Sequence, residues 1–515
     1  MLLGTITVLG ALLRIWSPGR IGLWGDEVQF LNVSALPSYK AIVAFLYAHE
    51  SHPPLYYFMA RLAGVVTGNA QGVMAVVALS ASIALIPAAW WLASLSGRRG
   101  AGPVAAALVA ASVPLAILGV QLRPYSLFSL LLMLSVGTLL RAIGSLSVGW
   151  KGAWAGLMLL LLYLHHLAAF VFIAEVVPLA WVIWRSGDAT RAAKMWAPWV
   201  IAVAVLAVPD VLMLYHQHAL TGYLPAGTVD PLLAFRQFAR LCLTFPGELL
   251  LGVFACGAVL WRRWRVGDGN SGEAPQASIM AGVFLTVCLL LIAAGFSQSI
   301  LVEHLVLPFA PLAQVVAGTL VVTIASDRRV SGLLWSQFAV ACVVLSSLFS
   351  VGYTKTTLNL MARYIAAEST PTDLIVLLPG FLGGALNRYL GVPLSQIDYP
   401  VIGPEPLYRF DRQISRIMAA EPLGMSLDSI SAASAAGRRV WLIIPTKWIT
   451  GSGPQRQMSD PRSGQAAAFE AQAGILRQHL VHNFGQPNIT MSAPDLSWSM
   501  EVLTLELFAH PDSGG

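Results

Sequence analysis

An acidic pair, Asp26 and Glu27, stands immediately after Gly25 and shortly after the first apolar run of the chain. Such a pair is unusual in a protein with only 11% charged residues. A carboxylate can accept the proton of a hydroxyl group that attacks a substrate, which is general-base catalysis. A solvated loop can hold the same two residues by chance, and spacing alone leaves both interpretations open.

Histidines and a few cations form a second group of candidate residues. Several histidines at one membrane level can bind a phosphate or a divalent metal, whereas a single histidine there more often only forms hydrogen bonds. An arginine between two apolar runs can hold a phosphate through two hydrogen bonds, or it can extend toward lipid headgroups. The candidates for contact with a phosphate or another part of a substrate are His52, Arg61, Arg123, Tyr125, His165, His166, His304 and Lys355.

The candidate metal ligands are Glu50, His216 and His218. They do not stand at a spacing that defines a metal site on one helical face. No cofactor is therefore predicted with certainty, and a divalent metal is left open. The four cysteines show no paired spacing, which argues against a disulfide framework or a cysteine-based zinc site.

The composition shows which elements must position these residues. Hydrophobic residues make up 57% of the chain, and its 11% of charged residues is less than half of the roughly 25% typical of soluble domains. Apolar runs long enough to cross about 30 Å of hydrocarbon predict a polytopic α-helical membrane protein with about 11 transmembrane helices. The predicted spans are 2–16, 72–95, 101–121, 125–143, 153–167, 169–184, 195–215, 246–261, 278–299, 305–325 and 332–352.

Basic residues between these runs indicate the orientation. With a cytoplasmic N-terminus, every basic connection falls on the cytoplasmic side, as the positive-inside rule requires. These connections are 98–99, 141–151, 185–194, 262–265 and 328–329. The net charge of +6 therefore reflects membrane topology and does not indicate nucleic-acid binding.

One large outer loop, 17–71, follows from this orientation. Counting its apolar segment 53–68 as a span would invert every later loop, and the segment is short, opens with two prolines and contains Arg61. We therefore expect interfacial helices in this loop. The membrane domain is predicted to cover 1–352.

The tail, 353–515, is predicted to be an extracytoplasmic α/β domain. It is more polar than the membrane part, and strand-like and helix-like runs alternate along it. No recognisable acid–base pair stands in it, which predicts an accessory role. The expected strands are 373–378, 439–444 and 500–508, and the expected helices are 381–390 and 466–480.

Six short motifs in this order carry a resemblance to a known family. They are Gly25-Asp26-Glu27, His52-Pro53-Pro54-Leu55-Tyr56-Tyr57, Arg123-Pro124-Tyr125, Tyr163-Leu164-His165-His166, Ala197-Pro198-Trp199 and Leu305-Val306-Leu307-Pro308. The membrane part resembles the GT-C glycosyltransferases, in particular the branch of protein O-mannosyltransferases and lipid A aminoarabinose transferases (ArnT-like). The tail is similar to the extracytoplasmic domain that ends many bacterial relatives.

The resemblance implies an integral protein of the bacterial inner membrane that transfers a monosaccharide from a polyprenyl phosphate, with inversion, to an extracytoplasmic glycan, lipid or protein. It implies that Asp26 is the general base and that Glu27 orients it or contacts the acceptor or a metal. The chain departs from the family pattern at Glu303-His304-Leu305, where relatives often have an arginine. If that arginine meets the donor phosphate, His304 takes its place here.

Other functions remain open at this stage. Within the enzyme class, the alternative is a ligase or polymerase that moves an oligosaccharide from a lipid diphosphate. In a different class, a transporter would place ionisable residues at the bilayer midplane and often shows duplicated halves, and neither feature is evident here. A non-catalytic envelope scaffold is the third alternative. The sugar and the acceptor are not specified by the sequence.

Overall fold

The chain divides into two compact units, which are described separately. The computed structural model describes residues 1–17, 22–145, 147–220, 253–258, 275–295, 303–324, 332, 336–337, 340–347, 355–400, 407, 409–417, 419, 421–446, 461–492 and 501–510. The helical unit comprises Met1–Pro18, Ser51–Gln217 and Thr228–Val351, and the α/β unit comprises Gly19–Glu50, His218–Gly227 and Gly352–Gly515. The predicted outer loop 17–71 is thus shared between the two units.

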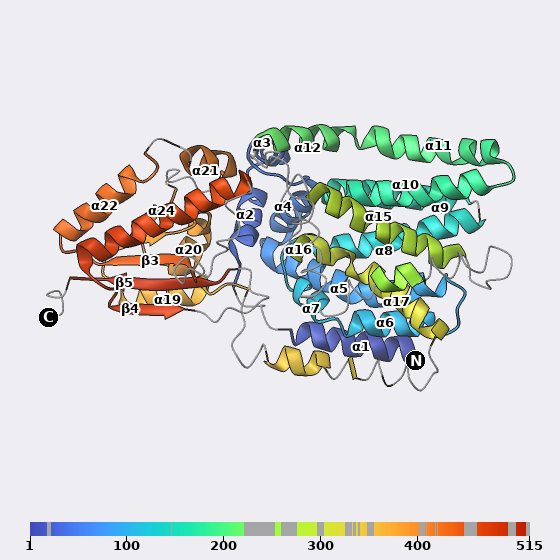
Figure 1. Cartoon of the computed structure of the whole chain (residues 1–515), viewed down its shortest axis with the longest axis horizontal. Helices are drawn as coiled ribbons and strands as arrows, with labels where there is room; N and C mark the ends of the chain where they lie inside the picture. The colour runs from blue at the N-terminus through green and yellow to red at the C-terminus, as the bar shows by residue number, and fades with distance from the viewer. Residues whose placement is uncertain are drawn as a thin grey trace. The chain divides into compact units, whose positions relative to one another are not determined.

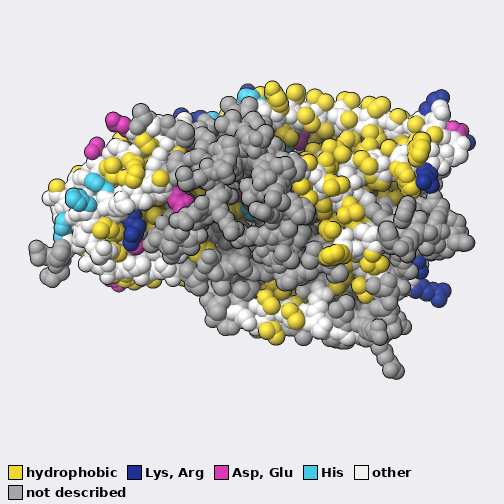
Figure 2. Space-filling view, in the orientation of Figure 1, with side chains coloured by type: hydrophobic (Ala, Val, Ile, Leu, Met, Phe, Trp, Pro, Cys, Tyr) yellow, Lys and Arg dark blue, Asp and Glu magenta, His cyan; other side chains and the backbone are white. Residues whose placement is uncertain are grey.

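Long apolar helices build the helical unit, and α8 packs against both α5 and α9 (Figure 1). Figure 2 shows hydrophobic side chains over much of its visible described surface, with Lys and Arg gathered toward one end. Its main helices are α1 (Leu2–Ile15), α4 (Leu55–Thr67), α5 (Ala70–Ser94), α6 (Ala101–Ala110), α7 (Val113–Leu118), α8 (Tyr125–Ser145), α9 (Val148–Leu164), α10 (Ala168–Arg185), α11 (Ala189–Leu206), α12 (Val208–Leu220), α15 (Pro275–Gly295), α16 (Glu303–Val306), η1 (Leu307–Phe309) and α17 (Ala310–Ile324).

Four helices in the described part of the chain are long and apolar enough to cross a membrane, and a fifth span results if α11 and α12, bent by 41°, are counted together. Other predicted spans correspond to shorter apolar helices, including α1, α9 and α10. The predicted spans 246–261 and 332–352 lie largely outside the described residues. The total of 11 spans therefore stays a prediction. At 13 residues, α4 is about 20 Å long, which is shorter than the hydrocarbon core.

The predicted span 101–121 is two helices, and a buried arginine explains how the break is tolerated. Arg14 of α1 is fully buried and donates hydrogen bonds to the carbonyl oxygens of Val109 (2.9 Å) and Ala110 (3.0 Å) at the end of α6. Its Nε also donates to Ser82 Oγ of α5 at 2.9 Å. The last carbonyls of a helix lack partners within the helix, so Arg14 satisfies them and joins three helices.

A buried carboxyl group further along the chain also joins three helices. Glu175 of α10 accepts hydrogen bonds from Trp154 Nε1 of α9 (2.6 Å) and Ser135 Oγ of α8 (3.0 Å). Polar groups that bond across helices contribute to packing in a membrane. The sequence analysis overlooked both Glu175 and Arg14, and their contacts favour a structural role for them over a transport pathway.

The α/β unit is built on one five-stranded sheet of order β2-β1-β3-β5-β4. β1 is parallel to β2 and β3, whereas β5 is antiparallel to β3 and β4. The expected strands and helices of the tail are confirmed, and β2, β4 and several helices are additional. The strands are β1 (Leu374–Leu377), β2 (Ser395–Asp398), β3 (Val440–Pro445), β4 (Ile489–Ser492) and β5 (Leu503–Phe508).

Helices of the α/β unit come from both ends of the chain. They are α2 (Gly25–Ser34), α3 (Tyr39–His49), α19 (Leu358–Glu368), η2 (Gly380–Leu382), α20 (Gly383–Leu390), α21 (Phe410–Ile417), α22 (Gly424–Ala435) and α24 (Pro461–Phe484). Alternate strand residues such as Val376 and Leu442 share a core with α21, α22 and α24. Trp441, on the other face, packs edge to face against Tyr364 of α19. Both faces are therefore covered, which explains why β1 and β5 are buried along their whole length.

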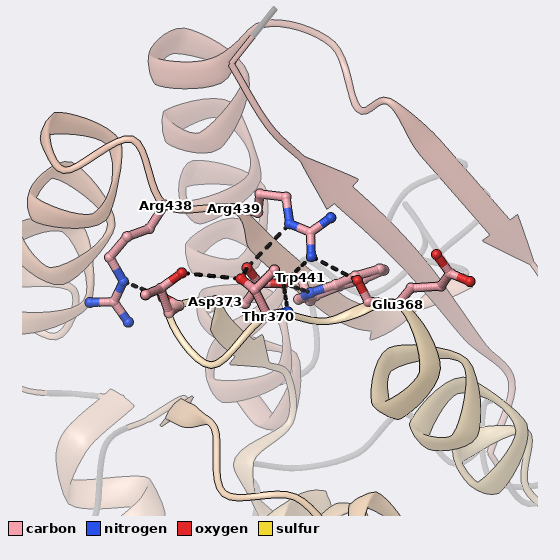
Figure 3. Close-up of polar contacts among 7 residues, drawn as sticks. Glu368, Thr370, Asp373, Arg438, Arg439 and Trp441 are labelled. Atoms are coloured by element: carbon pink, nitrogen blue, oxygen red, sulfur yellow. Dashed lines mark hydrogen bonds and ion pairs between the residues drawn. The ribbon is translucent and has the colours of Figure 1, made fainter. Parts of the chain in front are cut away.

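A buried aspartate, Asp373, stabilises the end of the sheet at which β1 and β3 begin. Asp373 accepts hydrogen bonds from Arg439 Nη2 (2.8 Å) and from the indole of Trp441 (2.8 Å) (Figure 3). Thr370 adds its hydroxyl and backbone N–H. Burial opposes ionisation, but these hydrogen bonds outweigh it and lower the pKa of Asp373.

We predict that Asp373→Asn destabilises the α/β unit by about 2 kcal/mol at pH 7, because hydrogen bonds to a charged group are worth more than neutral ones. A carboxyl group with a depressed pKa stabilises the fold above its unfolded-state pKa of about 3.9, and this contribution is lost as the pH falls. The deficit should therefore shrink as the pH falls below about 3.9 and through the lower folded-state pKa of Asp373. The measurement is the urea concentration at which β1 and β3 lose hydrogen-exchange protection in the full chain. Asp428→Asn, at an exposed position of α22, is the control, and equal losses in the two variants would contradict the prediction.

Candidate functional site

The predicted acidic pair forms the first turn of α2. Glu27 is the third residue of the helix, and its Oε2 accepts the backbone N–H of Trp24, the residue before the helix, at 3.3 Å. This bond satisfies an N–H group that has no partner within the helix. Asp26 lies in the same turn and is half-buried, whereas Glu27 is fully buried. The partial positive charge of the helix N-terminus favours the ionised form of both carboxyl groups.

Lys355 neutralises Glu27 directly. Its Nζ lies 2.7 Å from Oε1 and 2.8 Å from Oε2 of Glu27, and the Lys355 side chain is only 2% exposed. The sequence suggested a phosphate contact for Lys355, but did not indicate this ion pair. Since one carboxylate of the pair is neutralised and buried, Asp26 is the member with surface available to a substrate.

A second glutamate contacts the same turn. Glu501, 7% exposed, precedes β5, and its Oε1 accepts the backbone N–H of Gly25 at 2.6 Å. A Cβ atom at Gly25 would lie 2.7 Å from the ring of Phe381 and 3.1 Å from Glu501 Oε1, so only glycine fits. We refer to Gly25, Asp26 and Glu27 as the acidic turn. Burial, reinforced by the charges of Asp26 and Glu27, raises the pKa of Glu501 to about 8 despite hydrogen bonds from Thr356 and Gly25.

The acidic turn packs near the carboxyl ends of β1 and β3. β1 leads through α20 to β2 on one side, and the chain then passes to β3 on the other side of β1, which makes the β1–β3 boundary a topological switch point. Open α/β sheets bind ligands at the carboxyl ends of the strands there. Phe381 follows the end of β1, and Glu501 precedes Leu503, which pairs with Pro445 at the end of β3. The chain's own α2 therefore packs where such sheets commonly hold a ligand.

The second group of predicted residues meets in the helical unit. Arg123 Nη2 donates to Nε2 of His52 at 2.6 Å, and the rings of His52 and His165 meet edge to face at 6.2 Å between centroids. Tyr125 stacks obliquely between His165 (5.9 Å) and His304 (5.6 Å). We call these five residues the histidine cluster. The sequence motifs predicted its members, and the structure brings them together.

His52, in the outer loop, is neutral. Burial, followed by the charge of Arg123, lowers its pKa well below the usual value. Because Arg123 can only donate hydrogen bonds, His52 Nε2 must accept, which places its proton on Nδ1. Arg123 is therefore the permanent cation of the cluster.

His166 is held by residues that the sequence analysis overlooked. Its Nε2 lies 2.9 Å from Gln217 Oε1, and its Nδ1 lies 3.5 Å from a carboxylate oxygen of Asp210. Gln217 also donates to the backbone oxygen of His52 at 3.3 Å, which links this pair to the histidine cluster. An aspartate beside a proline in the apolar segment 195–215 was the available signal for Asp210.

The structure offers no support for a metal site in the part of the chain that it describes. Within those residues, no three His, Cys, Asp or Glu side chains converge closely enough to hold an ion. Glu50 is buried, His216 is half-buried, and the side chain of His218 lies outside the described residues. Arg61 is half-buried in α4.

We predict that Lys355→Met destabilises the α/β unit by about 3–5 kcal/mol, because removing one partner leaves a buried charge without compensation. The double variant Glu27→Gln/Lys355→Met should recover most of this loss, since it removes both charges. Thermal unfolding of the purified full chain measures the effect. Lys40→Met, at an exposed lysine of α3, should change little, and a Lys355→Met variant as stable as this control would show that the pair is dispensable for folding.

No family model matches the sequence, and no curated protein matches it significantly. ArnT from Cupriavidus metallidurans in the apo state aligns with 88% of this chain and 94% of its own, at 12% identity and a TM-score of 0.52. The archaeal oligosaccharyltransferase AglB from Archaeoglobus fulgidus aligns with 87% of this chain and 70% of its own, at 11% identity and a TM-score of 0.48, which is too weak to carry an argument.

The TM-score of 0.52 supports a shared fold, and the identity of only 12% leaves the substrate open. The alignment with apo ArnT covers 88% of this chain and 94% of the ArnT chain. Together with the long apolar helices, it shows that the chain is an integral membrane protein with the GT-C, ArnT-like fold.

Proposed function

We propose that this protein is a membrane glycosyltransferase that moves a monosaccharide from a polyprenyl phosphate to a hydroxyl group of an extracytoplasmic acceptor. The acidic turn carries the proposal. Glu27 is fully buried against Lys355, and the adjacent Asp26 keeps exposed surface in the same helical turn. A soluble donor would not require the apolar helices of a GT-C fold, whereas an isoprenoid chain has to remain in apolar surroundings.

In this reaction Asp26 is the general base. The acceptor oxygen attacks the anomeric carbon, the bond from that carbon to the phosphate oxygen breaks, and the polyprenyl phosphate leaves with the bonding electrons. The acceptor proton passes to Asp26. A single displacement with attack opposite the leaving group inverts the anomeric carbon. Glu27 and Lys355 hold the turn that presents Asp26.

We assign the donor phosphate to the histidine cluster. Arg123 supplies a permanent positive charge, and the imidazoles of His52 and His165 supply further hydrogen-bonding groups. Charge-assisted hydrogen bonds to a phosphate are stronger than neutral ones. His304, beside Tyr125, is proposed to take the place of the family arginine. Arg61 and His166 are proposed as further donor contacts.

The orientation follows from the basic connections of the sequence. We propose that the acidic turn and the α/β domain lie outside the cytoplasm, in the inner membrane of a bacterium, and that the acceptor is a glycan, a lipid or a protein of the cell envelope. The catalytic membrane domain is proposed to extend to residue 352. An oligosaccharide ligase that uses a lipid diphosphate is the alternative, and the donor used in the assay separates the two.

We predict that Asp26→Asn leaves a folded protein that binds the donor but transfers sugar at least about 100-fold more slowly, because general-base assistance is worth about 10²–10⁴ in rate. The assay uses a purified polyprenyl-phosphate monosaccharide and measures transfer and donor binding on one preparation. Asp188→Asn, at the start of α11, is the control. Near-normal turnover of Asp26→Asn would reject Asp26 as the base. Transfer only from a lipid-diphosphate oligosaccharide would favour the ligase.

We predict further that Arg123→Ala weakens donor binding about 10- to 100-fold, since a hydrogen bond to a charged group contributes about 1.5–3 kcal/mol. Binding of a polyprenyl phosphate to the detergent-solubilised protein is the measurement. Arg141→Ala is a matched control, because Arg141 is exposed near the opposite end of α8. Unchanged donor affinity in Arg123→Ala would mean that Arg123 only extends toward lipid headgroups.

A further inference from the structure

The carboxyl group of Glu501 is buried close to other carboxyl groups. It accepts the N–H of Gly25 at 2.6 Å, while Asp26 and Glu27 of the same turn bring two more carboxyl groups close to it. The backbone N–H of Glu501 donates to the carbonyl oxygen of Lys355 at 3.2 Å. The backbones of Thr356 and Glu501 also pair in an isolated parallel β-bridge. Glu501 thus joins the acidic turn, through its side chain, to the segment that supplies Lys355, through its backbone.

Packing alone does not explain an acid at this position. A glutamine has the same shape and would accept the same N–H without electrostatic repulsion from Asp26 and Glu27. Burying an unpaired ionised carboxylate is unfavourable, and burial raises the pKa of Glu501 to about 8. What a glutamic acid has and a glutamine lacks is a change of charge within the pH range in which enzymes work.

We propose that Glu501 is a positioning residue that holds the acidic turn through Gly25 and adjusts the basicity of Asp26 through its own charge. This inference rests on the proposed function, because it assigns a partner to the proposed base. It also gives the α/β domain a part in the transfer reaction, in place of the accessory role that the sequence predicted. The charged and titratable groups that face Glu501 are Asp26 and Glu27 on α2, Lys355 before α19 and Tyr389 on α20.

The sign of the effect follows from this arrangement. Below about pH 8 Glu501 is protonated, the Glu27–Lys355 pair is neutral, and Asp26 carries the remaining negative charge of the turn. Above that pH the ionised Glu501 adds a second negative charge, which increases the affinity of Asp26 for a proton. A stronger base accepts the acceptor proton more readily. The turnover number should therefore rise about two- to fivefold as the pH passes through 8.

The kinetic experiment compares three variants of the full chain over pH 6.5–9.5. Glu501→Gln keeps the hydrogen-bond acceptor and should retain most activity at pH 6.5, but it should lose the rise near pH 8. Glu501→Ala removes the acceptor and should lower the turnover number about 10- to 100-fold, with little change in KM for the donor, because a small misplacement of a catalytic group is enough to slow a reaction. Glu506→Gln is the matched control, since Glu506 is also buried, on β5, but pairs with Arg477.

A variant of Thr356 tests whether the rise in activity reports the titration of Glu501. Thr356→Val removes the hydroxyl group that stabilises the ionised carboxylate, so the rise in activity should move to higher pH. This test remains decisive if Glu501→Gln fails to accumulate as a folded protein. A pH profile of Glu501→Gln or Thr356→Val that is indistinguishable from the wild-type profile would overturn the proposal.

A readout without catalysis separates this inference from the proposed function. Hydrogen exchange of the segment 22–34 in the full chain should accelerate in Glu501→Ala, but not in Glu501→Gln or Glu506→Gln, if Glu501 holds the turn. Unchanged exchange in Glu501→Ala would reject the positioning role. If the wild-type protein transfers no sugar from a polyprenyl phosphate, the proposed function fails, and hydrogen exchange still decides whether Glu501 positions the turn.

Discussion

The buried ion pair between Glu27 and Lys355 is the interaction on which the α/β unit depends. Neither side chain retains appreciable exposed surface, so neither charge can be left without the other. The pair joins residues separated by 328 positions and ties the start of α2 to the chain that leads into α19. Together with the bond from Gly25 to Glu501, it explains why residues 19–50 form a compact unit with the C-terminal part.

The same pair divides the roles of two adjacent carboxyl groups. Neighbouring carboxylates repel each other when both are ionised. Lys355 neutralises Glu27 by direct contact and so removes this repulsion, and Glu501 adds a group whose charge depends on pH. The protein thus separates a structural carboxylate from a reactive one within a single helical turn, and the environment of each side chain determines its role.

Polar groups in the helical unit follow a comparable rule. Arg14 and Glu175 are buried among apolar helices, and each is held by hydrogen bonds from or to neighbouring helices. Arg123 donates a hydrogen bond to His52 and lies among the rings of the histidine cluster. A guanidinium group is a permanent cation that can bind a phosphate through two hydrogen bonds. This property supports the assignment of the donor phosphate to the histidine cluster.

The sequence by itself determined the membrane class, the motifs of the GT-C fold, the candidate residues of both clusters and the main strands of the tail. These properties depend on local composition and periodicity, which short segments carry. It did not reveal that Glu27 pairs with Lys355, that Glu501 accepts a bond from Gly25, or that Asp210 and Gln217 hold His166. The contacts of Glu27 and Gly25 join residues 328 and 476 positions apart, and those of His166 depend on the packing of α12. Only the tertiary structure decides such pairs. A buried charge needs a partner, but the position of a residue in the sequence does not show which distant group will lie beside it in the folded chain.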